Sequence, residues 1–191
     1  MKEIPASQAY RLLEPGPIVM VSTCDNDKAN VMTMGFHMMI QHEPPLIGCV
    51  IGPWNHSYRA LRRTGECVIA IPGLDLAETV VDVGNCSGQL LDKMERFGLK
   101  SRPAKSVSAP LLTDCLANIE CSVVDVGLCN LFILEAKRIW IDESRTDRRT
   151  MHHRGDGRRR YAGPQRTHGQ MALPPVSVAV AILTNAAARC I

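Results

Sequence analysis

The sequence predicts a mainly β domain: a small antiparallel β-barrel with short helices inserted between its strands. Three observations favour this fold class. Residues 18–142 alternate between short extended runs, often rich in β-branched residues, and turn-forming residues. These runs are not separated by the long regular helices that a parallel sheet of βαβ units requires. Apolar residues make up 46% of the 191-residue chain, which is enough for one domain with its own core.

The first half of the barrel is predicted from three extended runs. Residues 18–23 are β-branched and apolar, and residues 30–37 continue as a second run. Asp25-Asn26-Asp27-Lys28 between them has the composition of a turn, so the two runs are expected to form a hairpin. A third strand over residues 46–51 follows the strand-breaking pair Pro44-Pro45.

The second half of the barrel is predicted in the same way. Residues 67–71 form an apolar run that Pro72-Gly73 ends. Residues 119–126 and 131–141 form a later pair of strands around Gly127. Five or six strands in this order favour a small closed antiparallel sheet.

Three short helices are expected between the strands. The first begins near Asn55 and ends at Gly65. The second begins at Asp75, and Glu78 three residues later completes a capping-box pattern. The third covers residues 89–97, and Gly98 then suits the left-handed position that ends many helices.

The cysteine content and the apolar stretches of the sequence indicate the redox state of the thiols and the expected cellular location. The chain has eight cysteines but no C-x-x-C, so reduced and mostly buried thiols are expected instead of a disulfide framework, a zinc ribbon or an all-cysteine iron–sulfur cluster. No apolar stretch reaches the roughly 18 residues of a membrane span, and the first residues lack the apolar region of a secretory signal. A cytoplasmic protein without membrane contact is expected.

Common catalytic signatures are absent from the sequence. It contains no G-x-G-x-x-G after a strand, no G-x-x-x-x-G-K-[ST], no G-x-S-x-G and no H-E-x-x-H. His37, His42 and His56 are scattered without an accompanying carboxylate pattern, so no metal site is predicted. These absences exclude the familiar hydrolase, kinase and Rossmann patterns.

Two segments are candidates for ligand binding. Asn55-His56-Ser57 begins a helix directly after a strand and a Gly-Pro turn, where free N–H groups suit a phosphate; an ordinary helix cap is the alternative. On the second strand, Asn30 and Thr33 could bond the polar edge of a ring, and Gly35 permits close backbone approach; a core strand is the alternative.

A basic segment follows the last predicted strand. Its arginines are Arg145, Arg148, Arg149, Arg154, Arg158, Arg159, Arg160 and Arg166. Such a segment can bind nucleic acid or an anionic cofactor, and a solvated or disordered segment is the favoured alternative.

Short motifs along residues 12–162, taken in order, resemble the flavin reductase-like, FMN-binding split-barrel family, which includes the flavoredoxins. The matching pieces are Pro17–Thr23, Asn30–Thr33, Glu43–Ile47, Ile51-Gly52-Pro53, His56-Ser57-Tyr58, Thr64–Pro72, Ser87-Gly88, Asp92-Lys93-Met94, Ala109-Pro110-Leu111, Glu120-Cys121 and Leu131–Asp142. The sequence departs from the family pattern at Ala70, where many members have Asn, at Met94, which replaces Phe, and at Gln89, which replaces Arg.

The resemblance implies an FMN-binding split β-barrel, an antiparallel Greek-key barrel, over residues 1–162, with residues 163–191 as a divergent tail. It implies that the flavin carries the chemistry, so no catalytic side chain and no metal are expected. Residues 30–36 would line the flavin ring, and the phosphate and ribityl chain would be held near residues 52–57. The implied FMN-binding residues are Asn30, Met32, Thr33, Met34, Gly35, Gly52, Asn55, His56, Ser57, Ser87, Gly88, Lys93 and His152.

The same resemblance implies an oxidoreductase that moves electrons between NAD(P)H, or a redox partner protein, and flavin or small acceptors. A flavoredoxin-type carrier without NAD(P)H activity is the alternative. A homodimer with FMN near its interface is also expected. A nucleic-acid-binding module built on the arginine-rich segment is less favoured, because aromatic residues make up only 4% of the chain and few are available to stack on bases.

Overall fold

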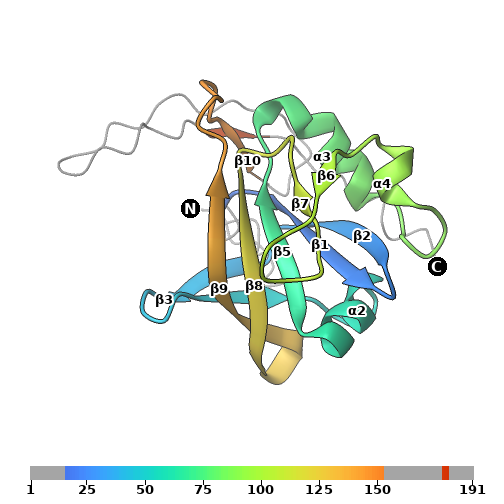
Figure 1. Ribbon diagram of the computed structural model, residues 1–191, viewed down its shortest axis with the longest axis vertical. Helices are drawn as coiled ribbons and strands as arrows, with labels where there is room; N and C mark the ends of the chain where they lie inside the picture. The colour runs from blue at the N-terminus through green and yellow to red at the C-terminus, as the bar shows by residue number, and fades with distance from the viewer. Residues whose placement is uncertain (1–15, 153–177, 181–191) are drawn as a thin grey trace, which may run out of the picture.

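The computed structural model describes residues 16–152 and the backbone of residues 178–180. Seven strands form one antiparallel sheet in the order β2-β1-β5-β8-β9-β4-β3, with β2 and β3 at its edges (Figure 1). The sheet wraps around a core made by β1, β2, β4, β5, β8 and β9, which confirms the predicted split barrel. The strands are β1 Val19–Asp25, β2 Lys28–Met34, β3 His37–Gln41, β4 Leu46–Val50, β5 Glu66–Ile71, β6 Ser101–Arg102, β7 Leu111–Leu112, β8 Ala117–Val126, β9 Leu131–Ile141, β10 Thr150–His152 and β11 Val178–Val180.

The predicted hairpin at the start of the barrel is confirmed. β1 and β2 pair in antiparallel register down to Asp25 opposite Lys28. The two residues between them, Asn26 and Asp27, have φ angles of 51° and 60°. Asn and Asp enter this left-handed region more readily than other non-glycine residues, which is why they favour a two-residue turn here.

The predicted run over residues 30–37 is wrong in one respect, because it spans two strands. β2 ends at Met34, and the chain turns at Gly35-Phe36 before β3 begins at His37. The carbonyl of Phe36 accepts a hydrogen bond from the amide of Val50 at 3.0 Å. The chain thus leaves β1, with which β2 pairs, and continues as β3, which pairs with β4. β3 is therefore an edge strand on the far side of the split, and the β3–β4 hairpin projects away from α3 and α4 (Figure 1).

Two hydrophobic cores lie on opposite faces of β1. Val19 and Val21 point into the barrel, where they join Leu61 and Phe132. Met20 points outward into a second core beneath α3 (Ala77–Gly84). Burial on both faces explains why this strand reads as an unbroken apolar run.

A short strap near the end of the described region completes the second core. The amide of Ile18 donates to the carbonyl of Met151 at 2.7 Å, and that of Leu74 donates to Arg149 at 3.0 Å. The Met151 side chain is fully buried in the second core. Strand β10 therefore links the start of β1 to the segment after β5.

The helices match the predictions only in part. α2 (Ser57–Thr64) forms as expected and ends at Gly65, whose φ is 68°. The capping box predicted from Asp75 and Glu78 is wrong: residues 74–76 form a 3-10 turn, and α3 starts at Ala77 without a side-chain cap.

The third predicted helix is shorter than expected. α4 covers only Lys93–Arg96, not residues 89–97. The Asp92 carboxylate caps it by accepting the amides of Met94 and Glu95 at 2.8 and 3.1 Å. Gly98 has a φ of 60°, which confirms its predicted place at the helix end.

The seven cysteines in the described region are free thiols, and Cys49, Cys67, Cys115 and Cys121 are buried. This agrees with the predicted reduced state, while Cys190 lies outside the described residues. Within those residues, no helix is long and apolar enough to cross a membrane.

Candidate functional site

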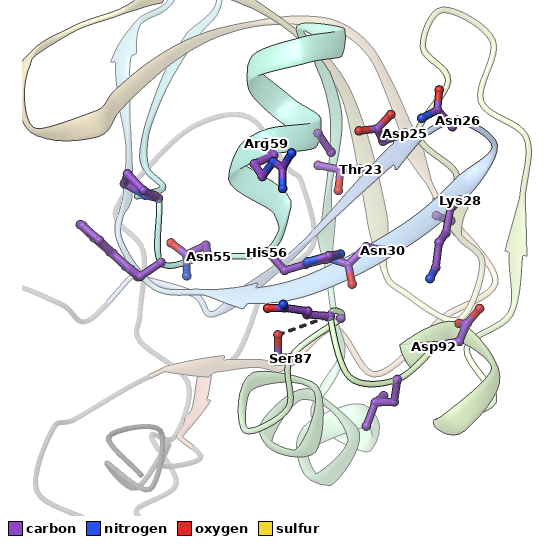
Figure 2. Close-up of a pocket in the computed structure, with 17 residues that line it drawn as sticks. Thr23, Asp25, Asn26, Lys28, Asn30, Asn55, His56, Arg59, Ser87 and Asp92 are labelled. Atoms are coloured by element: carbon purple, nitrogen blue, oxygen red, sulfur yellow. Dashed lines mark hydrogen bonds between the residues drawn. The ribbon is translucent and has the colours of Figure 1, made fainter. Parts of the chain in front are cut away.

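A cavity of about 530 Å³ opens where the β1–β2 hairpin, the start of α2 and the α3–α4 connection meet (Figure 2). Its size falls within the range of small-molecule sites. The residues that line it are Thr23, Asp25, Asn26, Lys28, Ala29, Asn30, Pro53, Trp54, Asn55, His56, Arg59, Ala60, Ser87, Gly88, Gln89, Leu91 and Asp92.

Five of the predicted site residues line this cavity: Asn30, Asn55, His56, Ser87 and Gly88. They come from three separate stretches of the chain. Asn30 lies on β2, residues 55–56 lead into α2, and residues 87–88 lie in the α3–α4 connection. The fold thus brings together motifs that the sequence analysis could only place in order.

Two further predicted residues support the lining residues from outside the cavity. Ser57 is buried, and its hydroxyl accepts a hydrogen bond from the side-chain amide of Asn30 at 2.7 Å. The amide of Gly52 donates to Asn55 Oδ1 at 3.0 Å. These bonds fix the orientation of Asn30 and Asn55, two of the three asparagines that line the cavity.

The other predicted residues of β2 do not line the cavity. The Thr33 hydroxyl donates to the carbonyl of Val80 at 2.6 Å, where we had expected a bond to a ring edge. Met34 lies in the barrel core, and Met32 packs partly buried against it. Gly35 connects β2 to β3. Contact between this segment and a flavin ring stays a prediction.

The two remaining predicted residues also lie away from the lining. His152 is on β10, where its Nε2 is 3.3 Å from the Thr150 hydroxyl. Its neighbour His153 lies outside the described residues. The Lys93 ammonium group is buried and donates to the carbonyl of Val83 at 2.8 Å.

Lys93 forms a hydrogen bond across the α3–α4 connection, which we call the Lys93 clip. Its bond to Val83 joins the two ends of the loop that carries Ser87 and Gly88. Burial lowers the pKa of this lysine to about 8, against 10.5 for a free side chain. Lys93 therefore acts on the cavity by holding one of its walls.

The sequence analysis missed Thr23, Lys28 and Arg59, which also line the cavity. Thr23 lies opposite Asn30 across the β1–β2 pair, so the predicted hairpin register carried a signal for it. Its side chain is fully buried, and its hydroxyl has no hydrogen-bond partner among the described residues. Buried hydroxyls are usually paired, which makes this one notable.

The cavity carries positive charge that the described residues do not neutralise. Lys28 and Arg59 face it, and neither forms an ion pair within the described region. The carboxylate of Asp25 is paired with Arg63. Burial, followed by the positive charges of Lys28, Lys93 and Arg59, lowers the pKa of His56. Such a site favours an anionic ligand.

Gly88 is required for the close approach of one cavity wall. A Cβ at this position would lie 2.8 Å from Cδ2 of His56 and would overlap the side-chain oxygen of Asn30. Only a glycine lets the α3–α4 connection pass this close to β2.

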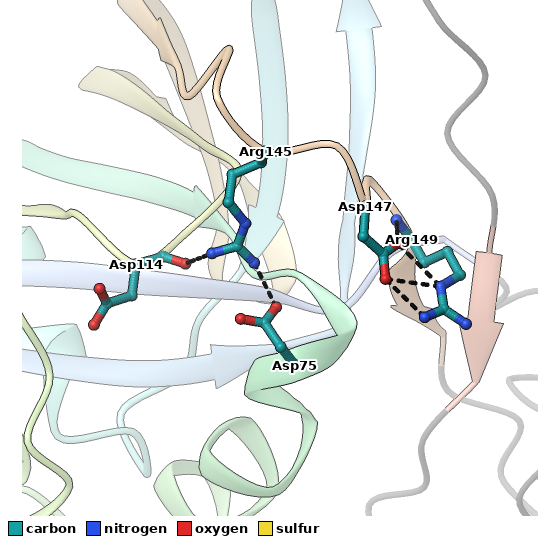
Figure 3. Close-up of polar contacts among 5 residues, drawn as sticks. All are labelled: Asp75, Asp114, Arg145, Asp147 and Arg149. Carbon is teal, nitrogen blue, oxygen red and sulfur yellow. Dashed lines mark hydrogen bonds and ion pairs between the residues drawn. The ribbon is translucent and has the colours of Figure 1, made fainter.

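The described part of the arginine-rich segment is tied down by acidic and carbonyl groups (Figure 3). Arg145 donates to the Asp75 carboxylate at 2.6 Å and to the carbonyl of Asp114 at 3.2 Å. Arg149 forms paired bonds with Asp147, and Arg148 donates to the carbonyl of Asp142 at 3.4 Å. Arg154, Arg158, Arg159, Arg160 and Arg166 lie outside the described residues, as does most of the predicted tail 163–191.

Across residues 16–152, no group of three or more His, Cys, Asp or Glu side chains is placed to hold a metal ion. The cavity lining combines cationic, amide and hydroxyl side chains with the carboxylates of Asp25 and Asp92.

Comparisons with known proteins agree with the motif order. A family model described as "Flavin reductase like domain" matches residues 11–161. An uncharacterized protein of Archaeoglobus fulgidus is 34% identical over 112 residues, which are 57% of this chain and 63% of the relative. The chain therefore spans less than two thirds of the length of that relative.

Solved structures give the same result. The flavoredoxin of Desulfovibrio vulgaris (Miyazaki F) aligns with a TM-score of 0.69 and 28% identity, over 77% of this chain and 81% of the flavoredoxin. An FMN-binding domain of a flavin reductases-like enzyme from Shewanella baltica aligns with a TM-score of 0.63 and 24% identity, over 73% and 75% of the two chains.

Proposed function

Because the chain belongs to the flavin reductase-like domain family, we propose that it is an FMN-binding flavoprotein of the cytoplasm that transfers electrons. The observation that carries the proposal is the cavity between β2, α2 and the α3–α4 connection, where the family-like motifs converge. Two of the solved structures that the chain resembles are described as a flavoredoxin and an FMN-binding domain.

The residues present fit the phosphate-bearing end of FMN. The Thr23 hydroxyl is buried on the cavity wall without a partner, as expected of a group that a ligand completes. The absence of a side chain at Gly88 leaves a cradle that a methyl group would fill. Lys28, Arg59 and His56 supply positive or proton-donating groups for a phosphate.

Each of these residues has a distinct task in the proposed site. Lys28 and Arg59 would neutralise the phosphate, and His56 would hydrogen-bond it. Asn30, held by Ser57, would present its side-chain oxygen toward the ribityl hydroxyls. When bound, FMN would supply reversible acceptance of electrons, so no side chain of the chain needs to act as an acid or base.

The electron donor distinguishes two forms of the proposal. In the first, NAD(P)H would be the electron donor, and free flavin or a small molecule would be the acceptor. In the second, another redox protein supplies or receives the electrons and the chain is a flavoredoxin-type carrier. The 28% sequence identity to a flavoredoxin supports this second, carrier form of the proposal.

A homodimer is part of the proposal, with FMN near its interface. Edge strand β3 and the residue before it expose large apolar side chains: Phe36 at 54%, Met38 at 57%, Met39 at 55% and Ile40 at 45%. An exposed apolar edge strand is a liability unless it is covered, and a second copy of the chain would cover it. Light scattering should give a dimer for the wild type and a monomer for a Met38→Glu/Met39→Glu variant; a monomeric wild type would contradict this part.

The absorbance spectrum of the purified protein tests the central proposal. The protein should be yellow, or should bind added FMN with quenching of its fluorescence. Flavin bands that bleach after anaerobic addition of NADH or NADPH would support the reductase form, and bands that persist would support the carrier form. A folded protein that carries no flavin and does not respond to added FMN would refute FMN binding.

A further inference from the structure

The position of His56 suggests a role beyond contact with the ligand. It lies at the start of α2, on the cavity wall, and Gly88 brings the opposite wall to within van der Waals range of its ring. Figure 2 shows His56 beside Asn30, with Lys28 and Arg59 around the same hollow.

Charged groups surround this imidazole from every element packed near it. Lys28 faces it from β2, Arg59 from α2 and Lys93 from α4, and each favours its neutral form. Two carboxylates are near the cavity, but Asp25 on β1 is paired with Arg63 and Asp92 accepts the first amides of α4. The net charge of the groups around His56 is therefore positive when no ligand is bound.

A phosphate monoester reverses that balance. It carries close to two negative charges at neutral pH. Placed between Lys28 and Arg59, it would cancel their effect on the imidazole and add an attractive negative charge of its own. An opposite charge at short range favours the protonated form of a histidine.

Resting on the proposed function, we infer that His56 takes up a proton from solvent when the phosphate of FMN enters the cavity, and that this proton makes the site select FMN over riboflavin. The imidazole is neutral in the ligand-free protein and becomes an imidazolium that donates to a phosphate oxygen. The preference for the phosphorylated flavin should then weaken as pH rises, because the proton becomes harder to acquire.

Nuclear magnetic resonance of the histidine ring protons tests the inference directly. His56→Gln identifies the His56 signal by its loss. In the ligand-free wild type this signal should titrate with a pKa below 6.5. Saturating FMN should raise the pKa by more than about 1, within the range expected for an opposite charge nearby, whereas riboflavin should leave it almost unchanged.

Calorimetry in two buffers of different protonation enthalpy measures the proton itself. At pH 7.2, where the FMN phosphate is mostly dianionic, the wild type should take up a measurable fraction of a proton. His56→Gln should bind FMN with no such uptake.

The outcomes separate the inference from the function on which it rests. Tight FMN binding with an unchanged His56 pKa, or with an equal rise for riboflavin, would overturn the inference and leave the proposed function intact. A folded protein that binds neither flavin would refute the proposed function. The effect of pH should be largest between the His56 pKa without ligand and the His56 pKa with FMN bound. In that range, raising the pH by one unit should lower the ratio of the riboflavin dissociation constant to the FMN dissociation constant by up to about tenfold.

Discussion

Replacing Thr23 with valine should stabilise the ligand-free protein and weaken FMN binding at the same time. The Thr23 hydroxyl is fully buried and has no partner among the described residues. A buried hydroxyl without a hydrogen bond costs about 1–3 kcal/mol. Valine keeps the shape and the β-branched preference of a strand residue while removing the polar atom. We expect the free energy of unfolding to rise by about 1–2 kcal/mol without FMN.

FMN should bind the same variant less tightly. A ligand group that pairs with the hydroxyl would contribute about 1 kcal/mol net, so its loss should raise the dissociation constant roughly fivefold. Urea denaturation of the ligand-free protein measures the first effect, provided that the denaturant slope is unchanged. Fluorescence titration with FMN measures the second.

Thr33→Val is the matched control. Thr33 lies on the adjacent strand, but its hydroxyl donates to the carbonyl of Val80 at 2.6 Å. Its loss should lower stability by about 1 kcal/mol. If Thr23→Val destabilised the ligand-free protein as much as the control does, the hydroxyl would have a partner in solution. The reasoning that assigns it to a ligand would then fail.

Three further substitutions test other parts of the site and fold. Gly88→Ala should raise the FMN dissociation constant at least about fivefold, because the added methyl group overlaps a cavity-lining side chain; unchanged affinity in a fluorescence titration would contradict the cradle. For Lys93, the folded pKa of about 8 lies below the unfolded value of 10.5, so the unfolded chain binds more protons between these pH values. Lys93 should therefore add up to about 3 kcal/mol to the free energy of unfolding between pH 8 and 10.5. Burial raises the pKa of the Cys49 and Cys115 thiols to about 12, which acts in the opposite direction. The test is therefore the difference in free energy of unfolding between wild type and Lys93→Met in urea denaturation, which should grow by that amount over this pH range. Glu120 is fully buried and accepts the amides of Lys105 and Ser106 and the indole N–H of Trp140. Glu120→Gln should cost about 2 kcal/mol in thermal unfolding, and a change below about 0.5 kcal/mol would argue against that role.

The strands of the barrel were predictable because their sequence signals are local. β9 was predicted with the bounds that the structure gives. The turn between β1 and β2 was predictable because Asn26 and Asp27 are residue types that favour the positive φ angles found there. β3 was missed as a separate strand because Met38, Met39 and Ile40 are all exposed, so no alternation of apolar and polar residues marks it. The sheet places β3 by pairing with β4, which is a tertiary effect.

The false helix start shows how a distant residue overrides a local pattern. Asp75 and Glu78 have the spacing of a capping box. The Asp75 carboxylate is instead bound by Arg145, which is 70 residues away along the chain. An arginine that the sequence placed in a basic tail thus binds the carboxylate that the local pattern assigns to a helix cap.

The candidate site divides in the same way. Asn55 and His56 were found because a helix that starts after a strand is a recognisable phosphate-binding pattern. Lys28 and Arg59 are charged residues without any motif of their own, and only the packing of α2 against the β1–β2 hairpin brings them together. The clip formed by Lys93 depends on a single contact across a loop, which no spacing rule encodes.

The strap formed by β10 has a consequence for how the chain is made. Met151 completes a core whose other members begin at Ile18, so the outer face of β1 is fully covered only after β10 has been made. During synthesis the inner barrel can assemble while the second core is still open to solvent and to chaperones. A chain shortened before residue 150 would keep that apolar face exposed, and aggregation of the shortened product is the expected result.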